Sequence, residues 1–126
     1  MPYYQFLVPE GGATLRHKAA VATAVTEAHV AVTGAPAGYV NCAFIAVGTD
    51  TVFVGGRAVD TARLVGLIRP GRTPEVKREL LLRLGAAWAG VTGEPLTDYA
   101  IWLHEVPGRQ TMENGEILPE PWETGL

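Results

Sequence analysis

Pro2 can supply a chemical group that no other residue of a protein provides. Cells usually remove an initiator methionine that precedes a small second residue, and its removal here would leave proline at the amino terminus. A terminal proline carries a secondary amine in place of an amide nitrogen. Because residues 3–8 are typical of a buried strand, we expect that amine at the edge of a core, where burial and neighbouring charges set its pKa. Taken alone, Met1-Pro2 is also a common start that indicates no function.

Arg69 and Arg72 flank the dipeptide Pro70-Gly71 between a predicted strand and a predicted helix. Ligands of α/β units gather where strands end. Two guanidinium groups close to the amino-terminal end of a helix form a good seat for a carboxylate or a phosphate. A solvated turn whose charges serve solubility would contain the same residues. The corresponding turn of the first half, residues 9–12, has no arginine, and this asymmetry favours a binding role.

Two histidines and a glutamate are further candidates for chemistry. His29 falls on the apolar stripe of a predicted helix and could reach the edge of a neighbouring strand. A histidine in such a setting is more often a satisfied core residue. His104 follows the apolar segment 101–103, where a histidine is out of place. Glu113 precedes a turn and by itself is typical of a surface carboxylate.

The elements that must position these residues are indicated by periodicity and by turn formers. We predict strands at residues 3–8, 39–47, 51–54, 64–68 and 99–104. The dipeptide Asn114-Gly115 predicts a hairpin turn near the carboxyl end.

Two helices are predicted between these strands. The first should begin with Thr14 as its N-cap and end at Gly34. Its apolar stripe is Leu15, Ala19, Ala22, Val25, His29 and Val32. The second should begin with Thr73 as its N-cap and Pro74 at its first position, and end at Gly93. Its apolar stripe is Val76, Leu80, Leu84, Ala87 and Val91.

An internal repeat organises the chain. The segment 32–36, Val-Thr-Gly-Ala-Pro, recurs at 91–95 as Val-Thr-Gly-Glu-Pro, and each copy closes a helix before a strand. We therefore predict two β-α-β units in tandem, at about 2–59 and 60–106, followed by a hairpin and tail at 107–126. The fold class is α+β, a two-layer sandwich in which a four-stranded sheet carries two helices on one face. The whole chain, 1–126, is predicted to be a single domain.

This architecture leaves the second face of the sheet without helices. Because that face would carry Phe, Val and Ile side chains, a monomer would expose a large apolar surface. Oligomerisation would cover it, and a threefold ring of such pseudo-symmetric units would close well.

Composition excludes several classes of protein. Hydrophobic residues make up 48% of the 126 residues, which excludes a disordered chain, and the net charge of −3 argues against a general nucleic-acid binder. No apolar run reaches membrane-spanning length and the amino terminus lacks the basic region of a signal peptide. Cys42 is the only cysteine and is expected to be a buried structural thiol, so a reducing, cytoplasmic location is predicted. The three histidines show no metal-ligand spacing, and no metal or cofactor is expected.

Considered together, these features resemble the tautomerase superfamily, and most closely its cis-3-chloroacrylic acid dehalogenase branch. The resemblance covers nearly the whole chain. It consists of the Met-Pro start, the duplicated β-α-β pattern and the order of several short stretches. These stretches are Thr26-Glu27-Ala28-His29, Val52-Phe53-Val54-Gly55-Gly56, Arg69-Pro70-Gly71-Arg72, Met112-Glu113-Asn114-Gly115 and Leu118-Pro119.

The resemblance implies a homotrimer that uses no cofactor. Pro2, freed of Met1, would be the catalytic amine, and Arg69 and Arg72 would bind the carboxylate of a small substrate. His29 would assist at that carboxylate or at the neighbouring oxygen, and Glu113 would activate water in a hydration. As a neutral amine Pro2 would move a proton between the oxygen and carbon of an enol. As a protonated amine it would complete the addition of water to an alkene.

One departure from the family pattern concerns His104. The dehalogenase branch has a tyrosine after its Ile-Trp-Val segment, where this chain has His104 after Ile101-Trp102-Leu103. Histidine can also donate or accept a proton. The resemblance therefore implies a tautomerase or hydratase for small enolic or unsaturated carboxylates, and weak cis-3-haloacrylate dehalogenase activity is compatible with it. Two alternatives are a non-catalytic trimeric binding or signalling module and an enzyme that uses His29 or His104 as its base without Pro2.

Overall fold

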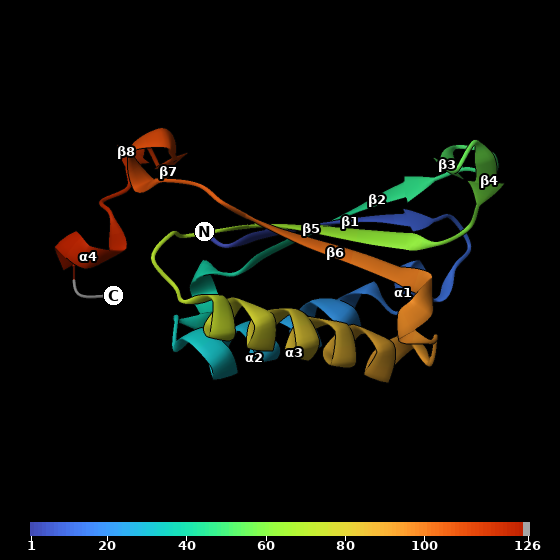
Figure 1. The fold of residues 1–126 in the computed structure, drawn as a ribbon, viewed down its shortest axis with the longest axis horizontal. Coiled ribbons are helices and arrows are strands. Elements are labelled where there is room, and N and C mark those ends of the chain that lie inside the picture. Colours follow the sequence, from blue (N-terminus) through green and yellow to red (C-terminus); the bar gives the residue numbers. More distant parts are fainter. Residues whose placement is uncertain (125–126) are drawn as a thin grey trace.

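Two long helices cover one face of a four-stranded sheet in the computed structural model, which describes residues 1–124 (Figure 1). The strands of the sheet are β1 (Tyr3–Pro9), β2 (Asn41–Val47), β5 (Ala62–Ile68) and β6 (Tyr99–Glu105). The helices are α2 (Lys18–Thr33) and α3 (Pro74–Thr92). The predicted fold class, a sheet with two helices on one face, is confirmed.

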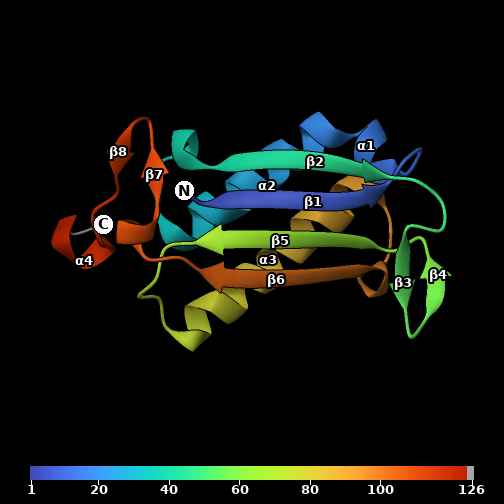
Figure 2. The ribbon, with the colours of Figure 1, turned by 90° about the horizontal axis from the view of Figure 1, so that it is seen from above.

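The sheet has the strand order β2-β1-β5-β6, which Figure 2 shows from above. Strand β1 pairs with β2 in parallel, and β5 pairs with β6 in parallel, as two β-α-β units require. The two central strands, β1 and β5, pair antiparallel, with Tyr3 opposite Leu67 and Leu7 opposite Arg63. The start of β1 therefore lies beside the end of β5.

Small elements extend the two ends of the sheet (Figure 1). One end carries the hairpin of β3 (Val52–Val54) and β4 (Arg57–Val59). The opposite end, where the amino terminus lies, carries the hairpin of β7 (Met112–Glu113) and β8 (Glu116–Ile117) and the short helix α4 (Pro121–Thr124). The remaining elements are α1 (Ala13–Arg16) and the 3-10 turns η1 (Ala37–Tyr39), η2 (Leu96–Asp98) and η3 (Gly108–Gln110).

Local signals in the sequence predicted several of these boundaries correctly. The Thr73 hydroxyl accepts a hydrogen bond from the amide of Val76 at 3.2 Å and so caps α3. Gly34 and Gly93 both end their helices in the left-handed conformation, with φ of 73° and 75°. The β7–β8 hairpin turns at Asn114 and Gly115, both with positive φ, as a two-residue turn requires.

The predicted start of the first helix is wrong. Thr14 does not cap it, because its hydroxyl instead accepts a hydrogen bond from the indole of Trp88 at 3.0 Å. The chain also leaves the helical conformation at His17, which divides the predicted helix into the short α1 and the long α2. Ala19, which was expected in the core, is exposed. The buried residues of α2 are Val21, Val25, Ala28 and His29.

The beginning of the second strand also differs from the prediction. Tyr39, which was expected to open that strand, lies in the 3-10 turn η1 that follows Pro36. The strand itself begins at Asn41. This difference leaves Tyr39 free to line the functional site described below.

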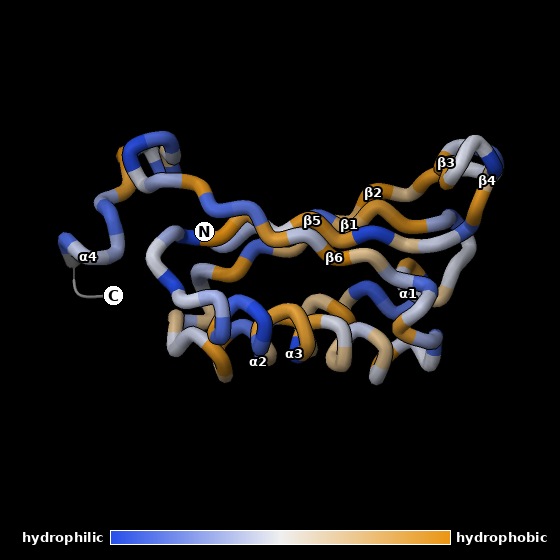
Figure 3. The backbone as a smooth tube through the Cα atoms, in the orientation of Figure 1, coloured by the Kyte–Doolittle hydropathy of each residue, from blue (hydrophilic) through white to orange (hydrophobic). Residues whose placement is uncertain are grey.

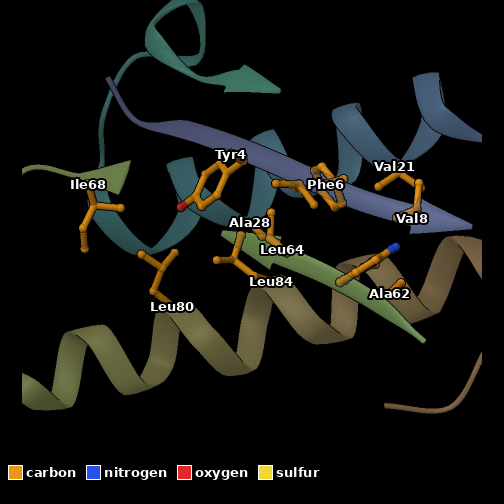
Figure 4. Packing of buried hydrophobic residues seen from close by; sticks show 12 residues of the cluster. Tyr4, Phe6, Val8, Val21, Ala28, Ala62, Leu64, Ile68, Leu80 and Leu84 are labelled. Atoms are coloured by element: carbon orange, nitrogen blue, oxygen red, sulfur yellow. The ribbon is translucent and has the colours of Figure 1, made fainter. Parts of the chain in front are cut away.

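The core lies between the sheet and the helices. Alternate residues of β1, namely Tyr4, Phe6 and Val8, point toward the helices and are completely buried (Figure 4). Trp88 of α3 is also completely buried, stacks on Tyr99 with ring centroids 3.7 Å apart, and meets Phe6 edge to face. No helical stripe in the sequence had included Trp88.

The other face of the sheet has no covering helix (Figure 1). Hydrophobic residues recur along the strands (Figure 3), and Ile45, Val65 and Trp102 point to this open face, where Trp102 is 52% exposed. The predicted apolar face is therefore present. Among the described residues, no helix has the length and apolar character needed to cross a membrane.

The Thr14–Trp88 hydrogen bond predicts a specific stability effect. Thr14→Val keeps the shape of the side chain but leaves the buried indole N–H without an acceptor, so the free energy of unfolding should fall by about 1–3 kcal/mol. Urea denaturation followed by Trp fluorescence measures this change. Thr14→Ser, which keeps the hydroxyl, should lose less. Equal losses in both variants would show that the methyl group, and not the hydrogen bond, stabilises this site.

Candidate active site

A pocket of about 570 Å³ lies at the end of the sheet where β1 begins and β5 ends. Four segments contribute to it: the amino terminus, the loop after β5, the end of α2 with the turn that follows, and the start of α4. The residues that line it are Met1, Pro2, His29, Thr33, Gly34, Ala35, Pro36, Tyr39, Arg69, Pro70, Gly71, Arg72, Pro121 and Trp122. The structure thus brings Pro2, His29, Arg69 and Arg72 to one cavity.

Pro2 is buried and is held by the neighbouring strand β2. Its carbonyl oxygen accepts hydrogen bonds from the Asn41 backbone amide at 3.0 Å and from Asn41 Nδ2 at 3.1 Å. Asn41 is the polar exception in an otherwise apolar strand. A polar residue in this apolar strand is the feature of the sequence that could have indicated the hydrogen bond to Pro2.

Glu113 meets the amino terminus from the β7–β8 hairpin. Both of its carboxylate oxygens lie 2.7 Å from the Met1 ammonium nitrogen, so the two groups form an ion pair. Figure 2 shows β7 close to the amino terminus. Glu113 does not line the pocket itself, but the ammonium nitrogen that it contacts belongs to Met1, the residue before Pro2.

The loop between β5 and α3 presents both arginines. Arg72 Nη1 donates to the Arg69 carbonyl oxygen at 3.2 Å, and Arg69 Nη2 donates to the Pro119 carbonyl oxygen. Within residues 1–124 neither guanidinium forms an ion pair. Burial lowers the pKa of Arg72 from its usual value. Two uncompensated cations in a partly enclosed pocket favour an anionic ligand.

Glu105, at the end of β6, supports this loop from outside the pocket. Its Oε2 accepts a hydrogen bond from the Gly71 amide at 3.3 Å, and its Oε1 forms a salt bridge with Lys77 at 3.2 Å. On the other side, Gly71 lies against the ring of Trp122, since a Cβ atom at position 71 would be 3.7 Å from that ring. The indole of Trp122 thus forms part of the apolar wall of the pocket. No sequence pattern had indicated this residue.

His29 extends from α2 and is only 1% exposed. Its Nδ1 lies 2.6 Å from the hydroxyl of Tyr4, and its Nε2 has no hydrogen-bond partner among the described residues. Burial lowers the pKa of His29 to about 4, with further lowering by the charges of Arg72 and of the amino terminus. The imidazole is therefore neutral at pH 7. The expectation that His29 lies on the buried face of the helix is confirmed.

Two other residues that the sequence analysis considered, His104 and Cys42, do not line this pocket. His104 is exposed on the open face of the sheet and does not line this pocket. Cys42 is half-buried on β2, and burial raises the pKa of its thiol. Within residues 1–124 no three His, Cys, Asp or Glu side chains are grouped so that they could hold a metal ion.

The pocket therefore combines three chemical capacities. Two guanidinium groups can bind a carboxylate, a neutral imidazole can exchange hydrogen bonds with an oxygen atom, and the apolar wall can accept a small carbon skeleton. The amino-terminal segment adds a basic group at the same place, next to the Glu113 carboxylate.

Comparison with known proteins gives the class to which this fold and pocket belong. A family described as "Putative oxalocrotonate tautomerase enzyme" matches residues 1–125, so the chain belongs to this family of the tautomerase superfamily. The resemblance noted in the sequence is confirmed.

Solved structures agree with this assignment. A member of the cis-3-chloroacrylic acid dehalogenase (cis-CaaD) family superposes with a TM-score of 0.90 at 28% identity, over 98% of this chain and 88% of that chain. RhCC from Rhodococcus jostii RHA1 superposes with a TM-score of 0.80 at 27% identity, over 95% of this chain and 88% of that chain. A fused 4-OT, described as an asymmetric trimer, has the same fold, with a TM-score of 0.84 at 24% identity over 92% of this chain and 95% of that chain. No curated protein matches the sequence.

The low pKa of His29 predicts a pH-dependent loss of stability. In the unfolded chain an imidazole with an ordinary pKa of about 6.5 takes up a proton where folded His29 remains neutral. The unfolded chain therefore binds more protons between pH 6.5 and pH 4, and stability falls as the pH is lowered. From pH 7 to pH 5 this residue should reduce the free energy of unfolding by about 2 kcal/mol, as measured by urea titration.

The control for this prediction is His29→Asn, whose side chain can still accept a hydrogen bond from Tyr4. This variant lacks the titrating group, so its stability should change less between the two pH values. If both proteins lost the same amount, other groups would be the cause.

Proposed function

We propose that this protein is a cofactor-independent tautomerase or hydratase that acts on small enolic or unsaturated carboxylates. The observation that carries the proposal is the meeting of the amino-terminal proline with the Arg69–Arg72 loop at one pocket. Membership of the tautomerase family supports it. The proposal requires that Met1 is removed, since only then is the Pro2 nitrogen an amine.

In the tautomerase reaction Pro2 acts as a neutral base. Arg69 and Arg72 hold the substrate carboxylate, and the amine takes the hydroxyl proton of the enol. A proton is then delivered from the amine to the neighbouring carbon, so that the enol becomes a ketone and the amine is restored. The two arginines favour this role, because neighbouring cations lower the pKa of an amine.

In the hydratase reaction Pro2 acts as an acid and Glu113 as a base. Glu113 takes a proton from water as the oxygen bonds to the far carbon of the alkene, while Pro2 gives its proton to the carbon next to the carboxylate. If the far carbon carries a halogen, the product loses hydrogen halide and becomes an aldehyde. The ion pair between Glu113 and the Met1 ammonium supports this role, because it places the carboxylate beside the amino-terminal end of the pocket.

The proposal includes a homotrimer. The apolar open face of the sheet, with Trp102 at its surface, supports association, and the fused 4-OT structure is described as a trimer. His104 lies on this same face. It can therefore take part in turnover only if a neighbouring subunit brings it to another pocket.

A second candidate function follows from the contact between Met1 and Glu113. In a chain that keeps Met1, this ion pair neutralises Glu113, and Pro2 contributes only an amide nitrogen. Arg69 and Arg72 would still bind a carboxylate in such a chain. Such a chain would be a trimeric binding or signalling module without catalysis.

Replacing Pro2 tests the enzymatic proposal. Pro2→Ala should lower turnover of phenylenolpyruvate, an enolic carboxylate, by about 100-fold or more, the usual contribution of a general acid or base. Absorbance of the enol measures the rate, and size-exclusion chromatography checks that the oligomer is intact.

The control is Pro9→Ala, at the far end of the same strand, which should retain activity. Intact mass of each protein establishes that Met1 is absent. Undiminished turnover by Pro2→Ala, or retention of Met1 in an active protein, would contradict the proposed mechanism.

Replacing Arg72 tests the carboxylate seat. Arg72→Gln keeps a hydrogen-bonding side chain but removes the charge, so kcat/KM for the same substrate should fall by about 10- to 100-fold, mainly through KM. Arg83→Gln, an exposed position on α3, is the matched control and should be silent. A wild-type KM for Arg72→Gln would show that the carboxylate binds elsewhere.

A further inference from the structure

Tyr4 makes a hydrogen bond to His29 that the proposed chemistry does not use. Its hydroxyl lies 2.6 Å from His29 Nδ1, and its ring meets the imidazole edge to face at 5.6 Å between centroids. Both side chains are almost completely buried. The contact therefore takes place in a region from which water is excluded, where hydrogen bonds are strong and their directions matter.

The position of the Tyr4 ring is fixed by the opposite strand. Gly66 of β5 lies directly across from Tyr4, and a Cβ atom at Gly66 would approach Tyr4 Cε1 to 2.7 Å. Only glycine leaves room for the ring here. Figure 4 shows that the ring extends from β1 toward the helix layer. The sheet therefore holds the hydroxyl at a fixed place beside α2.

The hydrogen-bond partners decide where the protons lie. Burial raises the pKa of Tyr4, so its hydroxyl keeps its proton at neutral pH, and His29 is neutral. Among the described residues, the Tyr4 hydroxyl has His29 Nδ1 as its one acceptor. If Nδ1 carried the imidazole proton, Nδ1–H would donate to the Tyr4 oxygen, and the buried hydroxyl proton of Tyr4 would have no acceptor among the described residues, at a cost in free energy. The O–H therefore donates to Nδ1, and the imidazole proton lies on Nε2.

We propose that Tyr4 is a positioning residue that holds His29 in the tautomer with its proton on Nε2, so that His29 presents an N–H donor to the ligand. His29 lines the pocket, and Nε2 is the ring nitrogen left without a partner in the described chain. The inference rests on the proposed function for its consequence: His29 would donate to a carboxylate or carbonyl oxygen of the substrate. It would not act as a base through Nε2.

The charges around His29 agree with this role. Arg72 and the amino terminus both disfavour a positive imidazole, and no carboxylate forms an ion pair with His29 in the part of the chain that is described. A neutral donor adds a hydrogen bond to an anionic ligand without a third cation beside the two arginines. Because Tyr4 holds the imidazole proton on Nε2, this nitrogen of the neutral ring is a hydrogen-bond donor and not an acceptor.

Nitrogen NMR of the imidazole tests the inference without any activity measurement. In 15N-labelled wild-type protein at pH 7, long-range 1H–15N spectra should show His29 with Nε2 protonated and Nδ1 unprotonated. Signals are assigned with His17→Gln and His104→Gln variants. A wild-type spectrum with the proton on Nδ1 would overturn the proposal, whatever the substrate proves to be.

The matched variants are Tyr4→Phe and Tyr99→Phe. Tyr4→Phe should shift the His29 nitrogens toward a mixture of tautomers and lower kcat/KM for the enol by roughly five- to tenfold, the effect of one neutral hydrogen bond. Tyr99 is also hydrogen-bonded, to Glu94, but lies outside the pocket, so Tyr99→Phe should change neither readout. Unchanged nitrogen signals in Tyr4→Phe would contradict the inference.

The two proposals can fail separately. If Pro2→Ala retains full activity while wild-type His29 has its proton on Nε2, the proposed reaction is wrong and the role of Tyr4 stands. If Pro2→Ala is inactive while Tyr4→Phe keeps both wild-type spectra and rates, the reaction stands and Tyr4 is only a core residue.

Discussion

The antiparallel pairing of β1 with β5 is the constraint on which the site depends. Two parallel β-α-β units meet through these strands, so the start of the first unit lies next to the end of the second unit's first strand. Residues that are far apart in the sequence, Pro2 and the loop 69–72, therefore reach the same edge of the sheet. Had β1 and β5 run parallel, the amino terminus and the arginines would lie at opposite ends of the molecule.

Opposed charges surround the amino terminus at this edge. The arginines lie on one side without ion pairs, while Glu113 contacts the terminal ammonium on the other. Glu105 does not neutralise the arginines by a close ion pair, because its oxygens bind the Gly71 amide and Lys77. The amino terminus therefore lies close to charged groups of both signs.

Local signals carried most of what could be predicted from the sequence. The cap at Thr73, the left-handed Gly34 and Gly93 and the turn at 114–115 depend on a few adjacent residues, and the structure contains them as expected. Thr14 failed as a cap because a residue 74 positions away, Trp88, takes its hydroxyl. The Tyr4–His29 contact and the wall formed by Trp122 were likewise invisible, because they arise from packing between elements and leave no local pattern. Pro2, Arg69 and Arg72 were suggested by their own chemistry and position in the chain, whereas the role of Glu113 was suggested only by the resemblance to a family.

The internal repeat gives the sheet two ends that are built from equivalent elements. His29 and Trp88 occupy equivalent positions, since each carbonyl accepts a hydrogen bond from the threonine four residues later. In the second half the large indole of Trp88 fills the interior and stacks on Tyr99. At that end of the sheet lies a cavity of about 20 Å³, lined by Asp60, Glu94 and Asp98 among others. In the first half the smaller imidazole of His29 lines a pocket of about 570 Å³, whose charged lining residues include Arg69 and Arg72. The two ends of the pseudo-symmetric fold thus differ in the size of their cavities and in the charge of the residues that line them.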